Sequence, residues 1–195
     1  MRRESRMITD TLYRAIALVT TFGLAAGTAA AQFRLTSPDI TPGGTIAEGQ
    51  VFDSFGCSGQ NVSPALAWSG APTGTKSFAL LLHDPDAPTG GAGFWHWIAY
   101  DIPATTTGLP QGAGKSDGSA LPPGAASVAN DYGTPGYGGP CPPAGDKPHR
   151  YNFTLYALKV AKLDVPKGAS ASVAGFMINA NAIGKATLTG RYGRK

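Results

Sequence analysis

The chain has 195 residues, of which 42% are hydrophobic and 14% are charged, and its formal net charge is +4. This length fits one domain, and the low charge argues against intrinsic disorder despite 27 glycines and 16 prolines. The sequence has no block of lysine or arginine residues, so it lacks the electrostatic footprint of a nucleic-acid-binding protein. The glycines and prolines instead predict many short elements separated by turns.

The first 31 residues are typical of a secretory signal peptide. A basic start precedes the apolar run 15–26, and an alanine-rich motif then predicts cleavage after Ala31. An uncleaved anchor is the alternative, but the run is shorter than the ~20 residues that a stable membrane span needs. We therefore predict an exported protein, periplasmic or secreted, whose single domain occupies residues 32–195.

The charge of the mature chain follows from this cleavage. The leading segment contains four arginines but only two acidic residues, so its removal brings the protein closer to neutrality. A near-neutral protein has no global field that attracts polyanions. Any site for an anion must therefore be a local arrangement of side chains.

The two cysteines of the chain are Cys57 and Cys141. Because exported proteins meet an oxidising compartment, we expect a disulfide bond between them. The alternative is a pair of buried free thiols. A zinc site would need further ligands at close spacing, and neither cysteine has such ligands beside it in the sequence.

Strand patterns dominate the first half of the mature chain. Weak patterns occur at 32–35, 45–52 and 66–68. The segment 77–83 is a continuous apolar run, which is typical of a buried central strand. The segment 94–101 is rich in aromatic residues and ends near a proline, and it is the second strong strand.

A long loop is expected between Pro103 and Pro148, because glycine and proline recur throughout this segment. A loop of this length in a compact domain is usually functional or disordered. This loop contains Tyr132, Tyr137 and Cys141, so we expect it to be ordered and functional.

Two further strands and one helix follow the loop. The segment 151–158 alternates polar and apolar side chains, as a half-buried strand does, and a weaker strand pattern covers 186–192. Between them, Ser170 is a candidate N-cap for a helix. Its apolar stripe, which we expect to pack against the core, consists of Val173, Phe176, Met177 and Ala180. About seven short strands predict a mostly β fold, a β-sandwich with one or two peripheral helices.

Acidic and histidine side chains gather at the ends of the predicted strands. Asp84 and Asp86 follow the apolar run 77–83, His96 lies inside the aromatic-rich strand, and His149 precedes the last strong strand. The prolines next to the two aspartates stiffen the strand exit. A carboxylate held in this way can orient an imidazole, so that the ring presents N–H groups to an anion.

Each of these residues also has a purely structural interpretation. Asp84 could cap a turn, His96 could be a core histidine with satisfied hydrogen bonds, and His149 could belong to a solvated loop. In the functional interpretation, the backbone N–H groups of the glycine pair 138–139 add donors to a small pocket for one phosphate or carboxylate group. Spacing alone leaves both interpretations open.

Several motifs follow one another in a specific order. They are NVSPAL at 61–66, DPDAP at 84–88, WHW at 95–97, NDYG at 130–133, GPCPP at 139–143 and HRY at 149–151. In this order and spacing the sequence resembles the phosphatidylethanolamine-binding protein family, and it is most similar to the bacterial branch called Raf kinase inhibitor-like. The resemblance runs from about residue 33 to residue 193.

The resemblance implies a Greek-key β-sandwich of two antiparallel sheets and a pocket that accepts phosphate-like anions. It assigns Asp84 and His96 to the pocket lining and Asp86 to holding the loop. It also implies His149 as a pocket residue, Pro142 or Pro143 as the pocket proline, and Tyr132 or Tyr137 as one wall. The C-terminal helix of eukaryotic relatives has no counterpart after Tyr192, so kinase binding does not follow from the resemblance.

The sequence thus favours a binding protein for a small anionic or phosphoryl ligand, with no catalytic residue, metal or cofactor. A protein-interaction module, such as an inhibitor of a protease or kinase, is the alternative, with the exposed loops as its docking surface. A metal-dependent or acid–base hydrolase is a third interpretation, although the common hydrolase motifs are absent from the sequence. The resemblance is also compatible with a homodimer, and the sequence identifies no protein partner.

Overall fold

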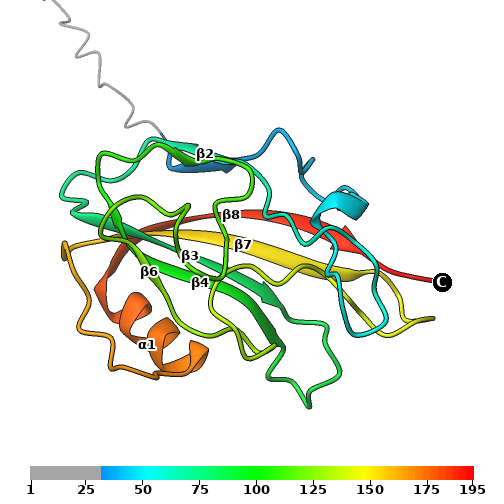
Figure 1. Ribbon diagram of the computed structural model, residues 1–195. Helices are drawn as coiled ribbons and strands as arrows, with labels where there is room; N and C mark the ends of the chain where they lie inside the picture. Colours follow the sequence, from blue (N-terminus) through cyan, green and yellow to red (C-terminus); the bar gives the residue numbers. More distant parts are fainter. Residues whose placement is uncertain (1–31) are drawn as a thin grey trace, which may run out of the picture.

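The structure, a computed structural model, describes residues 32–195, and the predicted signal peptide lies outside the described residues. These residues form two antiparallel β-sheets, one α-helix and one short 3-10 helix (Figure 1). The elements in chain order are β1 (Arg34–Thr36), the 3-10 helix (Glu48–Gln50), β2 (Leu66–Ser69), β3 (Ser77–Asp84), β4 (Phe94–Pro103), β5 (Gly108–Leu109), β6 (Ala126–Ser127), β7 (His149–Leu158), α1 (Ala171–Asn181) and β8 (Ala182–Tyr192).

The two sheets enclose the main hydrophobic core. The small sheet has the strand order β1-β2-β5, and the large sheet has the order β6-β4-β3-β7-β8. A second, smaller core lies between the opposite face of the large sheet and α1. Figure 1 shows this layering, with β2 on one side of the large sheet and α1 on the other. The mostly β fold with two antiparallel sheets and a peripheral helix agrees with the expectation from sequence.

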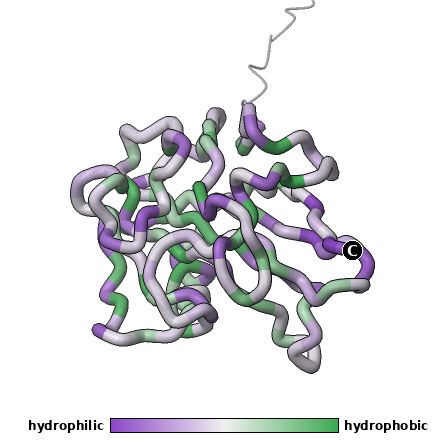
Figure 2. The backbone as a smooth tube through the Cα atoms, turned by 45° about the vertical axis from the view of Figure 1, so that its right-hand side comes forward, coloured by the Kyte–Doolittle hydropathy of each residue, from purple (hydrophilic) through white to green (hydrophobic). Residues whose placement is uncertain are grey.

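Strand β3 lies at the centre of the large sheet, and both of its faces are covered. Phe78, Leu80 and Leu82 pack between the sheets, while Ala79 and Leu81 face the α1 side. Successive side chains of a strand point to opposite faces, so a strand covered on both faces must be apolar throughout. This explains the continuous apolar run of β3. Figure 2 colours the backbone by the hydropathy of each residue.

The strand predicted at 45–52 is wrong. Thr45 forms an isolated bridge to Arg191, and the rest of the segment contains the 3-10 helix. Ile46 and Val51 are buried, but the backbone N–H of Val51 donates to the carbonyl of Glu48 within a local turn. Ile46 and Val51 therefore reach the core although the segment between them is not paired with a neighbouring strand.

The helix prediction is correct in place but wrong in orientation. The Oγ of Ser170 accepts a hydrogen bond from the Val173 N–H at 3.3 Å, which confirms the N-cap. However, Phe176 is 76% exposed, and the buried face consists of Ala171, Ala174, Gly175 and Ile178. The three small residues of this face allow the helix backbone to lie close to the sheet, and Ile178 packs into the smaller core.

This orientation predicts opposite outcomes for two substitutions on α1. Ile178→Ala is expected to lower the free energy of unfolding by about 2–4 kcal/mol, because it leaves a cavity in the smaller core. Phe176→Ala is expected to change it by less than about 0.5 kcal/mol, because the ring is already in solvent. Urea unfolding measures both values, and a larger loss for Phe176→Ala would contradict the orientation of the helix.

The long loop is ordered, as expected, and contains only the short strands β5 and β6. Backbone hydrogen bonds hold it to the rest of the domain; for example, the N–H of Asp131 donates to the carbonyl of Trp95 at 2.9 Å. Within residues 32–195, no helix combines the length and the apolar character that a bilayer crossing requires.

Candidate functional site

The antiparallel pairing of the large sheet brings the predicted site residues together. Strand β3 ends at Asp84, which pairs with Phe94 at the start of β4. Strand β7 pairs with the other side of β3 and begins at His149. Three segments that are distant in sequence therefore meet at one end of the sheet, where they border a cavity of about 240 Å³. Of the predicted residues, the cavity lining includes His96, Tyr132, Pro142, Pro143 and His149.

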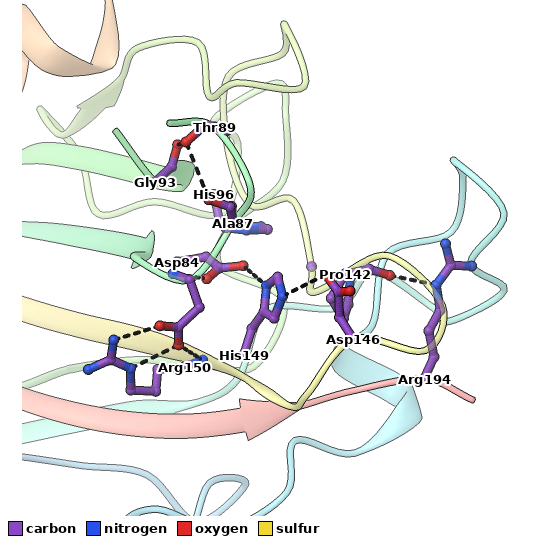
Figure 3. A network of polar contacts seen from close by, with 12 residues as sticks. Asp84, Ala87, Thr89, Gly93, His96, Pro142, Asp146, His149, Arg150 and Arg194 are labelled. Atoms are coloured by element: carbon purple, nitrogen blue, oxygen red, sulfur yellow. Dashed lines mark hydrogen bonds and ion pairs between the residues drawn. The ribbon is translucent and has the colours of Figure 1, made fainter. Parts of the chain in front are cut away.

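Asp84 and His149 form a buried pair at the base of this site. The Nδ1 of His149 lies 2.7 Å from Oδ2 of Asp84, and the two side chains are 5% and 3% exposed. The other carboxylate oxygen of Asp84 accepts the backbone N–H of Asp86 at 2.8 Å. Figure 3 shows Asp84 and His149 pointing toward each other, with Asp146 on the opposite side of the imidazole. The Nε2 of His149 lies 3.4 Å from Oδ2 of Asp146. Asp84 thus fixes the orientation of a ring that lines the cavity.

A β-bulge positions His96. Leu82 pairs with Trp97 but His83 pairs with Trp95, so His96 is the extra residue on β4. A bulge interrupts the alternation of a strand and re-aims the side chain of the extra residue. The ring of His96 is consequently buried and lines the cavity.

The partner of His96 differs from the one expected. Its Nδ1 lies 2.8 Å from the carbonyl oxygen of Gly138, whereas the sequence predicted that Asp84 would orient the ring. Burial lowers the pKa of His96 from 6.5 to about 4, although the Gly138 carbonyl and the Asp84 charge both act in the opposite direction. His96 is therefore neutral at physiological pH, and a backbone carbonyl fixes its orientation.

The glycine pair 138–139 acts through its carbonyl oxygens. Its N–H groups, expected to serve as ligand donors, are already used: Gly138 donates to the His96 carbonyl and Gly139 donates to Oδ1 of Asn61, both at 2.8 Å. A Cβ on Gly138 would overlap the ring of Tyr132, so the close approach requires glycine. The pair is a structural support for His96 and not an additional set of donors.

The two candidate tyrosines lie in different places. Tyr132 forms one wall of the cavity: its hydroxyl donates to the Gly139 carbonyl at 3.1 Å, and its ring stacks on Phe52 at 3.9 Å. Tyr137 lies in the core instead, where its hydroxyl donates to the Gln50 carbonyl at 2.7 Å. The assignment of Tyr137 to the pocket is a correction, because the side chain is buried and its ring packs against Trp97.

Asp86 also lies outside the cavity lining. Its carboxylate binds Arg150 in a bidentate arrangement, with Oδ2 to Nε at 2.8 Å and Oδ1 to Nη2 at 2.6 Å. The Arg150 side chain lowers the pKa of Asp86 from 3.8 to about 2. The pair stabilises the fold above the ordinary pKa of aspartate, and this contribution is lost as the pH falls toward 2. Asp86 therefore holds the loop after β3, as the resemblance implied.

Tyr151 is a site residue that the sequence reasoning missed. It is fully buried and lines the cavity, and its hydroxyl makes no hydrogen bond within the described residues. Burial, followed by the charge of Asp84, raises the pKa of Tyr151, so the hydroxyl stays protonated. Period-two alternation from His149 could have identified it, since residues i and i+2 of a strand share a face. Phe55 and Phe94 also line the cavity and were missed.

A disulfide bond forms part of the wall, as expected from the two cysteines. Cys57 and Cys141 are bonded with their Cα atoms 6.0 Å apart, and Cys141 lines the cavity. The C-terminal segment supports the same wall, because Arg194 donates to the carbonyl of Pro142 at 2.6 Å and to that of Gly56 at 2.7 Å. Figure 3 shows the contact between Arg194 and Pro142.

The cavity lining has little positive charge. Among the described residues that line it there is no lysine or arginine, while Asp131 lies in the lining and Asp84 directly behind His149. Within residues 32–195, no three His, Cys, Asp or Glu side chains converge as metal ligands would. Besides Asp131, the polar residues of the lining are histidines, tyrosines and a threonine, framed by aromatic rings and prolines.

Comparison with known proteins identifies the family. A model of the family described as phosphatidylethanolamine-binding protein matches residues 36–193. The chain belongs to this family.

Bacterial relatives are similar along most of the chain. The UPF0098 protein YbcL of Escherichia coli K12 is 52% identical over 163 residues, which cover 84% of this chain and 88% of YbcL. The crystal structure of YbcL, described as a new member of the mammalian family, matches with a TM-score of 0.82 at 51% identity, covering 85% of this chain and 100% of that chain. The putative lipoprotein LppC of Mycobacterium tuberculosis H37Rv is 44% identical over 138 residues, 71% of this chain and 63% of LppC.

The motifs that suggested the family from sequence have distinct structural roles in this member. Asp84 begins DPDAP and bonds to His149 of HRY, while the histidine of WHW is the bulged His96. Asn61 of NVSPAL holds Gly139, and Asn130 of NDYG donates to the His96 carbonyl at 3.3 Å. These contacts hold His149, His96 and, through Gly139, Tyr132, and these three residues line one cavity.

Proposed function

We propose that this phosphatidylethanolamine-binding protein family member binds a small ligand through a phosphate-like or other anionic group in the cavity. The proposal depends on one observation: His96, His149 and Tyr151 all line the same cavity, with Asp84 orienting His149. A few convergent polar groups in a mostly apolar concave site are typical of ligand pockets.

The dimensions of the site favour a head group over a long chain. Its volume of about 240 Å³ is smaller than the ~300–1,000 Å³ typical of pockets for drug-sized ligands. The aromatic side chains of Phe55, Phe94 and Tyr132 provide an apolar surface for the carbon atoms next to the anionic group. Any longer part of the ligand would extend into solvent past Phe55, which is 71% exposed.

We propose binding without chemical turnover. Cys141, the sulfur-containing residue of the lining, is held in the disulfide, and the hydroxyl of Thr89 already donates to the carbonyl of Gly93 at 2.9 Å. His96 has its Nδ1 bonded to a backbone carbonyl. These contacts support a role in positioning a ligand.

Export is also part of the proposal. The leading segment has the composition of a signal peptide, and one relative is described as a putative lipoprotein. A disulfide bond is expected to persist in an oxidising compartment outside the cytoplasm. Sequencing the N-terminus of protein recovered from the cell envelope and from the culture medium would test the predicted cleavage after Ala31.

Ligand binding predicts thermal stabilisation of the native protein. At a phosphoethanolamine concentration one hundred times the Kd, the gain is about 2.7 kcal/mol, which raises the Tm by roughly 5–10 °C. Tyr151→Phe is expected to reduce this shift without lowering the Tm of the free protein, because its hydroxyl has no partner among the described residues. Phe176→Ala, on the far helix, serves as the control and should keep the full shift.

The result that contradicts the proposal is equally specific. If millimolar phosphate and phosphoethanolamine leave the Tm unchanged, the cavity is not a site for phosphate-like groups. An unchanged shift in both His149→Ala and Tyr151→Phe would place the ligand elsewhere on the molecule. Circular dichroism of each variant establishes that the fold is intact.

A further inference from the structure

We propose that the outer face of α1 and the lysines around it form a docking surface for an anionic phospholipid bilayer. Helix α1 covers the face of the large sheet that points away from the small sheet, and it contributes nothing to the lining of the cavity. The inference is therefore independent of any ligand bound there. It depends on the side chains that α1 exposes, on the charges around them and on the residue type that carries those charges.

The exposed side of α1 is apolar. Among the described residues, four large hydrophobic side chains are exposed, and three of them are Val173 and Phe176 of α1 and Ile183, the second residue of β8. Val173, Phe176 and the partly exposed Met177 are three or four positions apart, so they share one stripe of the helix surface. Exposed hydrophobic residues that occur together, unlike single scattered ones, mark interaction sites.

The fold holds this stripe in its outward position. A Cβ on Gly175 would lie 3.8 Å from Cδ1 or Cδ2 of Leu81, so the helix backbone already approaches the sheet to within side-chain contact. A rolled helix would have to place the ring of Phe176 in that space. The end of the helix is also tied down, because the N–H of Lys159 donates to the carbonyl of Asn181 at 3.0 Å. Rotation of α1 therefore cannot bury the stripe within the chain.

Lysines surround the apolar stripe. The helix itself has no charged residue, whereas the connection from β7 to α1 has Lys159, Lys162 and Lys167, and β8 has Lys185. All four lysines are exposed, and Asp164 is the acidic residue of the segment 159–185. Figure 1 shows the connection passing beside α1, and its apolar residues pack into the same smaller core. The stripe thus lies in a positively charged rim, which complements an anionic partner.

The residue type of this rim favours a bilayer over a protein partner. The segment 159–185 contains no arginine. Protein interfaces are enriched in arginine, whose guanidinium forms directed pairs, and they are depleted in lysine. A lysine is a flexible point charge that keeps its ammonium group in water while its stem lies along apolar surface. Anionic phospholipids attract such lysines without requiring a fixed geometry.

The expected mode of binding is a helix that lies in the plane of the membrane interface. An apolar stripe of this kind enters the boundary between head groups and acyl chains, and the lysines stay at the level of the head groups. The connection to α1 begins after Leu158, which lies about 30 Å along β7 from His149. The docking surface and the cavity therefore have no residue in common, and the proposed export would bring this surface to a membrane.

Co-sedimentation with vesicles tests the inference. The purified exported protein is expected to sediment with vesicles of equal parts phosphatidylglycerol and phosphatidylcholine, but to stay in the supernatant with phosphatidylcholine alone. Binding should weaken as NaCl rises from about 0.05 M to about 0.5 M, because salt screens the charges. Phe176→Ala should reduce the affinity about tenfold. Replacing Lys159, Lys162 and Lys167 together with glutamine should reduce it about a hundredfold.

Two variants serve as matched controls. Replacing Lys115, Lys147 and Lys195 with glutamine removes the same charge from other exposed positions and should lower the affinity far less. His149→Ala alters the cavity and should keep vesicle binding. Equal losses in the two triple variants, loss of binding in His149→Ala, or equal binding to phosphatidylcholine alone would each overturn the inference. Circular dichroism of every variant establishes that the fold is intact.

Sedimentation equilibrium tests whether a second copy of the chain covers the same surface. A monomer, or a dimer that Phe176→Ala leaves intact, supports the bilayer as the partner. A dimer that Phe176→Ala converts to monomers would assign the stripe to a subunit interface and would overturn the inference. Failure of vesicle binding, with the full thermal shift in phosphoethanolamine retained, would refute this inference alone and leave the proposed function of the cavity standing.

Discussion

Replacing Asp84 with alanine is expected to lower the free energy of unfolding by about 3 kcal/mol and to abolish binding of phosphate compounds. Asp84 is almost fully buried and accepts two hydrogen bonds, from Nδ1 of His149 and from the N–H of Asp86. Removing one member of a buried, hydrogen-bonded pair leaves the other unsatisfied. The ring of His149 would also lose the contact that fixes its orientation. Urea unfolding and calorimetry measure the two effects.

The second aspartate of the same motif provides the matched control. Asp86→Ala removes the ion pair with Arg150, whose side chain is 47% exposed, so the loss of stability should be much smaller. Asp84→Asn keeps the shape and an acceptor for Asp86 but presents an amide to His149, and it should separate folding from binding. A greater loss of binding for Asp86→Ala than for Asp84→Asn would contradict the roles assigned here.

Loss of the disulfide bond is the second large expected effect. The bond joins residues 84 positions apart, for which chain entropy sets a ceiling of about 4.5 kcal/mol. A double substitution, Cys57→Ser with Cys141→Ser, is therefore expected to cost about 2–4 kcal/mol and to lower the Tm by roughly 5–15 °C. The affinity for phosphate compounds should fall as well, because Cys141 and the nearby Phe55 line the cavity. Scanning calorimetry, with and without ligand, measures both quantities.

Arg194 provides an internal comparison for this prediction. It links Gly56 to Pro142, the same two segments that the disulfide joins. Combining Arg194→Ala with the cysteine substitutions should cost more than the sum of the separate effects, because each connection partly replaces the other. Strict additivity would show that the two connections act independently. An unchanged Tm after removal of both cysteines would contradict the stabilising role of the bond.

Much of the fold was predictable because a buried strand has a recognisable pattern of apolar residues in the sequence. The run 77–83 is apolar at every position because β3 is covered on both faces, and its neighbours 94–101 and 151–158 are strands as predicted. The segment 45–52 has similar apolar spacing but no strand. Ile46 and Val51 reach the core through a 3-10 turn, and single-sequence patterns do not distinguish these two routes.

The residues of the site were easier to predict from the sequence than the hydrogen bonds between them. The motif order identified Asp84, His96 and His149; the two histidines line one cavity, whereas Asp84, expected in the lining, lies behind His149. Tyr137 was indistinguishable from Tyr132 in the same loop, and the structure places it in the core. Tyr151 was missed because a buried aromatic residue inside a strand resembles core packing, although its position two residues after His149 places it on the same face of β7.

The sequence by itself determined the long strands of the large sheet, the disulfide pair and the set of motifs, because each depends on residue type and on local spacing. Only the tertiary structure decided the face of α1 that is buried, the bulge that turns His96, and the carbonyl that fixes its tautomer. These three features depend on how closely two separate segments approach each other. That distance is set by side-chain volume and backbone hydrogen bonding across the fold, which a local pattern does not encode.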